Sequence, residues 1–410
     1  MRGRPVALDE PIQGARPAGA RFETAKRAVR RDRVVHVLYT VHRFWPAVGG
    51  TELALLDLAQ EIRKLGHEIT VVTSDEEGSP ASEEVKGIHV RRFAMKRYGK
   101  FRLPPKEYHE FVLNGGDWDI VHVKGQRVWS SDYLWRHMPK VKQPKVFTAH
   151  GFHQWHMHRR DPIELWYYRW HLPRALRAFD QIIALTGNEV EELVSWGVPR
   201  EKIMILPDGV NLHEFRVPPA GGFRSKFGVA RKHMLLYAGG FYDNKRVDFL
   251  VRAMASVKSD AELVVVGKDQ SGGKFRAECE RLASELGAPV KFVGVVDRTD
   301  LVKAFFEADL FLLASKFEGY GIVLLETMAA GVPFVSTPAG AALDLMRAGG
   351  GRVADTPQGM ARVVDELLSD DAQRRRLGET GKRLAHAQTL ENAARQHVAM
   401  YERLVARGHK

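Results

Sequence analysis

Cysteine is almost absent from this 410-residue chain, in which Cys279 is the only one. A single cysteine excludes an intrachain disulfide and fits a reducing compartment. No apolar run approaches the ~18 residues that a membrane-spanning helix requires, and the longest, near 305–314, is interrupted by Glu307 and Asp309. No apolar stretch follows the basic N-terminal residues, so a cleavable secretory signal is not indicated. We therefore expect a cytoplasmic protein.

Nucleic-acid motifs are also missing, although the net charge is +12. A basic surface can meet nucleic acid, anionic lipid or an anionic small substrate. The sequence has no zinc finger, RNA-recognition signature or continuous basic recognition helix, and its basic residues are spread along the chain. We expect no nucleic-acid partner and a solvated basic surface.

The sequence does contain a regular alternation of short apolar runs with amphipathic segments, which predicts an α/β fold with buried parallel strands. In the first half, strands are expected at 34–39, 68–73, 88–93, 120–123, 145–148 and 181–185. In the second half, strands are expected at 234–238, 262–266, 290–293, 310–313 and 333–336. The intervening helices include 52–65, 189–196, 248–257, 275–286, 300–307 and 321–330.

The chain length predicts about two domains, and a loop-like stretch at 212–222 separates the two alternations. We expect a mobile tail at 1–32 and an N-terminal Rossmann-like domain at 33–213. A C-terminal Rossmann-like domain at 214–389 and a final helical segment at 390–410 should follow.

The strongest local motif is the segment from Glu318 to Glu326, EGYGIVLLE, which lies between a predicted strand and a predicted helix. Ligands of open α/β sheets bind at the carboxyl ends of the strands. The amides of Gly321 and Ile322 would open the helix and face a phosphate. Tyr320 lies in the same turn. Glu318 would reach a bound sugar, and Glu326 would accept hydrogen bonds from ribose hydroxyls.

Two further glycine-rich turns follow predicted strands. In YAGGFYDNKR, Gly240 would let the backbone approach a ligand, and Lys245 would neutralise a diphosphate. In PAVGGTE, Gly50 and Thr51 begin a helix, where an anion can approach. Neither turn has the G-x-G-x-x-G spacing of a dinucleotide fingerprint. Taken alone, the first is more often a plain turn beside a surface lysine.

Together these segments resemble glycosyltransferase family 4, the retaining enzymes of the GT-B architecture, over nearly the whole globular part. The two glutamates match the family's E-x7-E motif, and His150-Gly151 matches its histidine after a strand. The other matching segments are Gly49–Glu52, Ala184–Glu189, Leu206–Asn211 with Phe215, and Gly331–Pro333.

The resemblance implies a GT-B fold with two Rossmann-like domains facing a central cleft. It implies transfer of a hexose-type sugar from a nucleotide-diphosphate sugar, bound by the C-terminal domain, to an acceptor on the N-terminal domain. The acceptor would be a glycan, a lipid-linked molecule or a small molecule. The family retains the anomeric configuration, with the leaving diphosphate taking the acceptor's proton, so no protein nucleophile is assigned. His150, Lys245 and Glu318 are the catalytic candidates. The last helix, from about 390 to 404, would return to the N-terminal domain.

The sequence also departs from the family pattern. The family has Arg where this chain has Gly240, and Gly where this chain has Arg246. We interpret the two changes as relocation of one phosphate-binding cation to Arg246. The family often has Asn at the position of Asp208, and its Gly-Gly pair after the motif helix is represented by Gly340-Ala341, with Asp344 nearby.

Competing interpretations remain for several residues. Asp117-Trp118-Asp119 precedes a strand, where a metal-binding D-x-D would follow one, and His150, His153, His156 and His158 lack a recognised ligand spacing. We therefore expect no metal and no cofactor. The segment 155–177, which is rich in Trp, Tyr and Arg, is either a weak peripheral membrane contact or a packed surface. A sugar-nucleotide epimerase and a catalytically silent sugar-nucleotide binder are the alternative functions.

Overall fold

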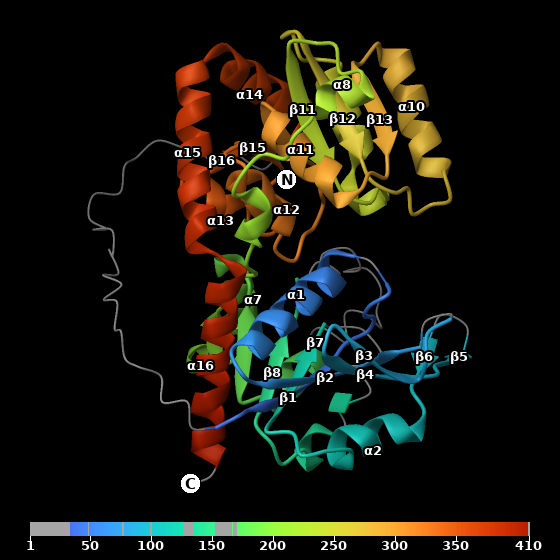
Figure 1. Ribbon diagram of the computed structural model, residues 1–410, viewed down its shortest axis with the longest axis vertical. Helices are drawn as coiled ribbons and strands as arrows, with labels where there is room; N and C mark the ends of the chain where they lie inside the picture. The colour runs from blue at the N-terminus through green and yellow to red at the C-terminus, as the bar shows by residue number, and fades with distance from the viewer. Residues whose placement is uncertain are drawn as a thin grey trace, which may run out of the picture. The chain divides into compact units, whose positions relative to one another are not determined.

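A computed structural model describes residues 33–47, 49–75, 78–98, 101–125, 134–135, 137–151, 166 and 170–408. Residues 34–410 form one compact unit, in which the strands gather into two large sheets (Figure 1). The predicted tail at 1–32 lies outside the described residues. The α/β fold class with two parallel-sheet domains is confirmed.

The first sheet has the strand order β10-β9-β8-β7-β1-β2-β4-β3. All neighbouring strands run parallel except β3, which pairs antiparallel with β4 at the edge. The bounds are β1 (His36–Thr40), β2 (Glu68–Ser74), β3 (Ser82–Val85), β4 (Ile88–Phe93), β7 (Ile120–Lys124), β8 (Lys145–Thr148), β9 (Gln181–Ala184) and β10 (Ile203–Ile205). A separate hairpin joins β5 (Lys96–Tyr98) to β6 (Phe101–Leu103).

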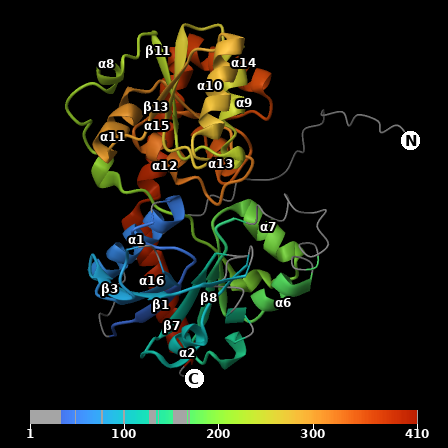
Figure 2. The same cartoon turned by 90° about the vertical axis from the view of Figure 1, so that its right-hand side faces the viewer.

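Helices cover both faces of this sheet, and side chains alternate between two cores as a parallel sheet requires. Val37 and Tyr39 belong to the core that contains α1 (Gly50–Lys64), whereas Leu38 belongs to the core that contains α2 (Lys106–Asn114). Figure 2 shows α1 on one side of the sheet and α7 (Gly187–Ser195) with α6 (Leu172–Leu176) on the other.

The second sheet has the order β13-β12-β11-β14-β15-β16, with all strands parallel. This is the doubly wound order in which the chain reverses direction beside its first strand. The strands are β11 (His233–Ala238), β12 (Ala261–Val266), β13 (Val290–Gly294), β14 (Leu310–Leu313), β15 (Phe334–Ser336) and β16 (Gly351–Val353). The helices between them are α9 (Val247–Met254), α10 (Lys274–Leu286), α11 (Arg298–Glu307), α12 (Ile322–Ala329) and α13 (Ala342–Arg347), preceded by η4 (Leu212–Phe215) and α8 (Phe223–Phe227).

Three helices close the chain: α14 (Pro357–Ser369), α15 (Asp371–Ala387) and α16 (Leu390–Gly408). Helix α14 packs on α9, and α15 packs on α12. Helix α16 lies alongside α1 of the first sheet (Figure 1). Its Tyr401 hydroxyl shares hydrogen bonds with the Tyr39 hydroxyl at 2.6 Å and with His122 Nδ1 at 2.7 Å. The last helix is therefore anchored in the core of the first sheet by buried polar groups.

The predicted strands and helices all occur, with bounds that differ by up to three residues at either end. Sequence reasoning missed the strands β3, β5, β6, β10 and β16 and helix α2, which are short or carry few apolar residues. The Ala184–Glu189 segment has a structural explanation: the Thr186 hydroxyl accepts the Glu189 amide at 3.2 Å, and Glu189 Oε2 accepts the Leu185 amide at 2.6 Å. This reciprocal cap begins α7.

None of the described helices is both long and apolar enough to span a membrane.

Candidate functional site

The candidate site lies at the carboxyl edge of the second sheet, between the loops that follow β11 and β14. These two strands are neighbours, but the chain leaves them in opposite directions, toward β12 and toward β15. Such a switch point opens a crevice for a ligand. The loop after β11 carries Gly240, Lys245 and Arg246, and the loop after β14 carries Glu318 and Tyr320. The fold therefore brings two of the predicted motifs together.

Asn244 joins the two loops through three hydrogen bonds. Its side-chain amide donates to the Phe317 carbonyl at 2.9 Å, and its side-chain oxygen accepts the Phe317 amide at 3.2 Å. Its carbonyl accepts the Lys316 amide at 2.8 Å. These three bonds fix the backbone on both sides of the crevice, so the next residues on each loop, Lys245 and Glu318, are placed opposite each other.

Lys245 and Glu318 form an ion pair with an Nζ–Oε1 distance of 2.5 Å, and the two side chains are only 19% and 12% exposed. The Ser315 hydroxyl donates to the same Glu318 oxygen. A mostly buried pair of this kind places opposite charges in direct contact and adds no net charge to the site. The site therefore offers a positioned cation beside a positioned carboxylate at the strand end.

The turn before α12 supplies free backbone donors. Gly321 is the N-cap with φ of 89°, a conformation that favours glycine, and no side chain of a described residue caps the helix. The amides of Ile322 and Val323 are thus open to an anion, whereas the Leu324 amide donates to the Gly321 carbonyl at 2.8 Å. Tyr320 is buried, and its hydroxyl donates to Gln388 Oε1 at 2.5 Å. Tyr320 fixes the turn against the end of α15.

The His150 loop of the first sheet meets this turn. A Cβ on Gly319 would lie 2.7 Å from the His150 carbonyl oxygen, and one on Gly151 would lie 2.9 Å from Gly319 Cα, so both positions require glycine. His150 has φ of 57°, and its buried Nε2 has no hydrogen-bond partner among the described residues. Burial lowers the pKa of its imidazole well below the usual value. His150 is therefore a neutral imidazole beside Glu318's loop, and its Nε2 has no partner within the part of the chain that the structure describes.

Glu326 lies one turn further along α12 and is paired with Arg298, whose Nη2 is 2.6 Å from Glu326 Oε1. The same guanidinium binds Glu214 of η4. Burial raises the pKa of the Glu326 carboxyl, and Arg298 opposes that rise. Sequence reasoning missed Arg298, and its only signal was a basic residue at the start of the helix after β13.

The remaining predicted donor residues are distributed around these groups. Gly240 receives a hydrogen bond on its carbonyl from the Tyr237 hydroxyl at 2.9 Å. Gly50 and Thr51 are the first residues of α1, which follows the loop after β1, and both are exposed. No hydrogen bond or ion pair between described residues joins them to Glu318.

Arg246 has φ of 48° and ψ of 48°, and its guanidinium lies 4.3 Å from the centre of the Phe249 ring. This left-handed conformation favours glycine, the residue that is usual here in the family. The departure noted in the sequence therefore places an arginine on a backbone that would suit glycine. The proposed relocation of the phosphate-binding cation to Arg246 stays a prediction.

Lys124, the last residue of β7, was not among the predicted site residues. It is 4% exposed, at the carboxyl edge of the first sheet, with its ammonium 5.8 Å from the centre of the Tyr39 ring. Burial lowers its pKa to about 8, and Asp208 opposes this. The predicted strand ended one residue earlier, at Val123, which left this lysine unnoticed.

The metal alternatives find no support among the described residues, which contain no cluster of three or more His, Cys, Asp or Glu side chains able to hold an ion. Asp119 precedes β7, at the amino edge of the sheet, and its carboxylate accepts the His36 amide at 2.9 Å. His153, His156 and His158 lie outside the described residues.

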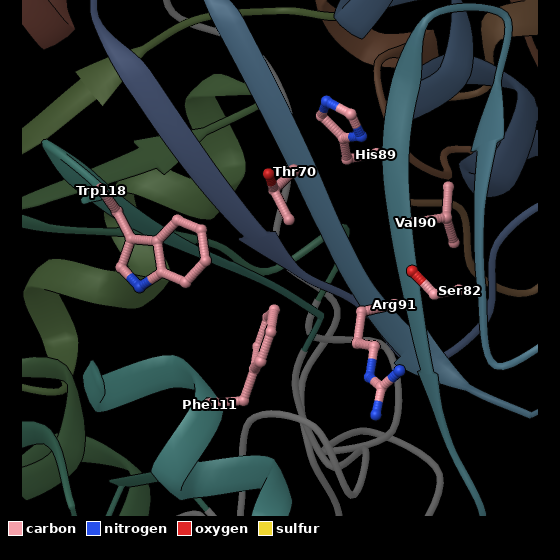
Figure 3. Close-up of a pocket in the computed structure, with 7 residues that line it drawn as sticks. All are labelled: Thr70, Ser82, His89, Val90, Arg91, Phe111 and Trp118. Carbon is pink, nitrogen blue, oxygen red and sulfur yellow. The ribbon is translucent and has the colours of Figure 1, made fainter. Parts of the chain in front are cut away.

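A cavity of about 300 Å³ lies elsewhere, between strands β2 and β4 and helix α2 of the first sheet (Figure 3). None of the predicted site residues borders it. The residues that line it are Thr70, Ser82, His89, Val90, Arg91, Phe111 and Trp118. It is separate from the switch point of the second sheet and contributes nothing to the candidate site.

Comparisons with known proteins give the family. Residues 48–214 match the model of "Glycosyltransferase Family 4", and residues 223–384 match "Glycosyl transferases group 1". An uncharacterized glycosyltransferase of Methanocaldococcus jannaschii is 25% identical over 87% of this chain and 94% of its own. A GDP-mannose:cellobiosyl-diphosphopolyprenol alpha-mannosyltransferase of Komagataeibacter xylinus is 25% identical over 92% of this chain and 95% of its own.

Among solved structures, Anabaena HepE in complex with UDP-glucose superimposes with a TM-score of 0.72 at 19% identity, covering 90% of this chain and 99% of that one. This likeness supports the two-sheet GT-B fold. The two family models together cover every strand of both sheets except β1, and these two relatives are named as glycosyltransferases and not as epimerases. The chain belongs to glycosyltransferase family 4 and is a nucleotide-sugar-dependent glycosyltransferase of the GT-B architecture.

Proposed function

We propose that this enzyme transfers a hexose from a nucleoside diphosphate sugar to an acceptor hydroxyl with retention of anomeric configuration. The observation that carries the proposal is the Lys245–Glu318 ion pair, at the switch point of the second sheet and beside the uncapped start of α12. A cation, free amides and a carboxylate at one strand edge suit a diphosphate joined to a polyhydroxylated sugar.

Each group has a proposed part. Lys245 and the first amides of α12 bind the diphosphate, and Glu318 accepts hydrogen bonds from sugar hydroxyls. His150 offers Nε2, which no described residue hydrogen-bonds, to the sugar or the phosphate. Glu326 accepts hydrogen bonds from the ribose. The two glutamates of the motif would thus bind different portions of the donor, Glu318 the sugar and Glu326 the ribose.

In the reaction, the bond between the anomeric carbon and the diphosphate oxygen breaks, and a bond from that carbon to the acceptor oxygen forms on the same face. The acceptor's proton passes to the departing diphosphate, which leaves with the bonding electron pair. Negative charge builds on the phosphates, and Lys245 stabilises it. We propose that no metal is required, because Lys245 and the helix amides supply this positive charge.

Arg246 is proposed as a second phosphate-binding cation in place of the arginine missing at position 240. A guanidinium can bind a phosphate bidentately from a different backbone position. Arg246→Ala should then cost roughly 10²–10³ in turnover, and adding Gly240→Arg should recover part of it. The backbone admits this second change, because a Cβ at 240 would meet only the flexible end of Gln270, at 2.6 Å. Normal turnover of Arg246→Ala would refute the relocation.

The central experiment is a panel of nucleotide-sugar donors. It includes UDP-glucose, which is named for the HepE structure, and GDP-mannose, which is named for the Komagataeibacter enzyme. A donor present at 100 times its dissociation constant should stabilise the fold by ~2.7 kcal/mol in a thermal shift measurement. Donors that bind are then tested for acceptor-dependent nucleotide release, with and without EDTA. The anomeric configuration of the product is read by NMR.

The outcomes separate the alternatives. Donor isomerisation without acceptor would indicate the epimerase, and binding without turnover would indicate the silent binder. An inverted product would refute retention, and complete loss of turnover in EDTA, restored by metal, would refute metal independence.

We also propose a weak peripheral contact with anionic membranes through the segment 155–177. The structure describes residues 166 and 170–177 of this segment. Trp166 and Trp170 are 57% and 52% exposed, which weakens the packing interpretation for these two, whereas Leu172 and Leu176 are buried. The guanidinium of Arg174 lies 5.3 Å from the Trp170 ring. Sedimentation with phosphatidylserine vesicles should show binding at low salt that fades at 0.15 M, where charges are screened over ~8 Å. No binding at low salt would refute this contact.

A further inference from the structure

Arg298 is the residue outside the recognised motifs that contacts the proposed donor site most directly. It is the first residue of α11, and its Nη2 lies 2.6 Å from Glu326 Oε1 on α12. Its Nε and Nη2 also bind Glu214 Oε2, with the Nε–Oε2 distance at 3.0 Å. The guanidinium lies over the ring of the buried Phe215, 5.8 Å from its centre. One side chain therefore links α12 to the segment η4.

The cluster around Arg298 carries more negative than positive charge. Glu326 from α12, Glu214 from η4 and Asp57 from α1 all act on one another. Lys86 also acts on Asp57 and opposes the negative charge there. Arg298 is the cation in direct contact with Glu326 among the described residues. Without it, a carboxylate that is 17% exposed would face two others with no paired cation, an arrangement that favours its protonation.

The contact between Arg298 and Glu326 fixes the orientation of the Glu326 carboxylate. Arg298 binds one oxygen of Glu326, Oε1, and leaves Oε2 without a hydrogen bond to any described residue. A bound guanidinium restricts rotation of the carboxylate, so the second oxygen keeps one orientation. A fixed, ionised oxygen accepts hydrogen bonds from hydroxyls more strongly than a mobile or protonated one.

We propose that Arg298 is a positioning residue for the ribose of the nucleotide donor: it holds Glu326 ionised and oriented so that the carboxylate accepts the ribose hydroxyls. The inference rests on the proposed function, which places the ribose at Glu326. It adds that recognition of the ribose depends on a residue from the next helix, anchored in turn by Glu214.

The test compares ribose recognition in binding alone. Isothermal titration calorimetry would measure UDP, GDP and ADP, and then the tightest binder against its 2′-deoxy form. In the wild type the deoxy form should bind about 10- to 100-fold more weakly, because a charged acceptor loses its hydroxyl. Glu326→Gln should reduce this ratio to below 3-fold. Arg298→Ala should reduce it similarly, and Arg298→Lys should restore an intermediate ratio, because lysine keeps the charge but not the planar fork.

The matched control is Arg281→Ala, which removes another arginine–glutamate pair of the same sheet's helices, the exposed Arg281–Glu285 pair. Its ribose to deoxyribose ratio should equal that of the wild type. In steady-state assays Arg298→Ala should raise the donor KM about 10-fold with kcat within 2-fold, because ribose binding is shared by ground and transition states. Thermal melting of each variant identifies any that fail to fold, and Arg298→Lys then carries the comparison.

The outcomes are distinguishable. If Glu326→Gln removes the ribose preference while Arg298→Ala and Arg298→Lys keep it, the positioning role is refuted and the ribose assignment stands. If the wild type shows no ribose preference, or Glu326→Gln keeps it in full, the ribose assignment fails and the inference fails with it. If Arg298→Ala lowers kcat and the melting temperature but leaves the ratio unchanged, Arg298 is only structural.

Discussion

Polar groups at the carboxyl edge of the second sheet, the second edge, differ from those where α16 packs on β1 and β7 of the first sheet, the first edge. At the second sheet, Lys245 forms an ion pair with Glu318 and Arg298 forms one with Glu326, so each of these groups contacts a partner of opposite sign. At the first sheet, His122 and His397 are buried, and burial lowers the pKa of both imidazoles, that of His397 to about 3.

The difference matches two tasks. At the second edge, negative charge would build on a departing diphosphate. Charged side chains that ion pairs already hold in place can stabilise that charge without first rearranging. The groups at the first edge are linked instead by neutral hydrogen bonds that run from the Tyr39 hydroxyl through Tyr401 and His122 to the Thr148 hydroxyl. Such a network specifies the docking of α16 but tolerates neither lost partners nor added protons. Substitutions at the second edge should therefore change catalysis, and those at the first edge should change stability.

The largest effect is expected from breaking the Lys245–Glu318 pair. Lys245→Ala should lower kcat by roughly 10²–10³, because the developing phosphate charge loses a preorganised cation. Glu318→Ala should lower kcat more than it weakens donor affinity, if the carboxylate acts at the sugar. Steady-state kinetics with the best donor would measure both.

The control for this pair is Lys316→Ala, which removes the exposed Lys316–Asp243 ion pair from the same loops. It should keep wild-type kinetics within about 2-fold, because exposed pairs contribute little. Equal losses in Lys316→Ala and Lys245→Ala would show that the loop geometry, and not the buried cation, is what matters.

The next effect is on stability at the first edge. Tyr401→Phe removes the hydroxyl that joins Tyr39 to His122 and leaves two buried groups without that partner, so the free energy of unfolding should fall by about 1–3 kcal/mol. Urea denaturation would measure it. Tyr39→Phe combined with Tyr401→Phe should cost less than the sum of the single changes, since they share one bond. A strictly additive double variant would contradict a connected network.

The contrast between the edges also explains what the sequence could predict. The glycines of the E-x7-E motif determine the local backbone conformation, so the start of α12 at Gly321 and Ile322 was predicted correctly, whereas their contact with a phosphate stays a prediction. The apolar runs predicted both sheets for the same reason. Pairings between distant segments carry no local signal: Glu214 and Arg298 are 84 positions apart, and Asn244 and Phe317 are 73 apart.

Burial was equally invisible in the sequence. Lys124 and His122 flank Val123 in a strand, and nothing in that strand shows that Tyr401, 279 positions away from His122, completes their surroundings. The edge strand β3, Ser82–Val85, has a polar sequence and forms because β4 offers an unpaired edge. Such features follow from tertiary contacts and not from periodicity.

A pH-dependent effect should follow from His397. Its folded pKa of about 3 is below the unfolded value of 6.5, so the unfolded chain takes up a proton first as the pH falls. The stability that depends on the neutral ring is complete above pH 6.5 and is lost toward pH 3. The slope is up to about 1.4 kcal/mol per pH unit. Urea denaturation from pH 7 to 5 should therefore give His397→Gln a flatter profile than the wild type.

Comparing slopes cancels the other titrating groups, including Glu189, whose carboxyl has a pKa raised to about 8 by burial and which acts in the opposite direction. The control is His89→Gln at an exposed strand position, which should leave the slope unchanged. Parallel profiles for the wild type and His397→Gln would mean that the ring is not held neutral in the folded protein.

The smallest effect on stability is expected at Arg246, where the second edge departs from its family. The residue has φ of 48°, and its guanidinium packs on Phe249. A side chain in this left-handed conformation costs roughly 1–2 kcal/mol, which glycine avoids. Arg246→Ala keeps the backbone strain and loses the ring contact, whereas Arg246→Gly loses the contact but relieves the strain. Arg246→Gly should therefore be about 1 kcal/mol more stable than Arg246→Ala in urea denaturation, although both variants lose the same charge. Equal stability of the two would show that the backbone at 246 relaxes out of the left-handed region once the arginine is removed.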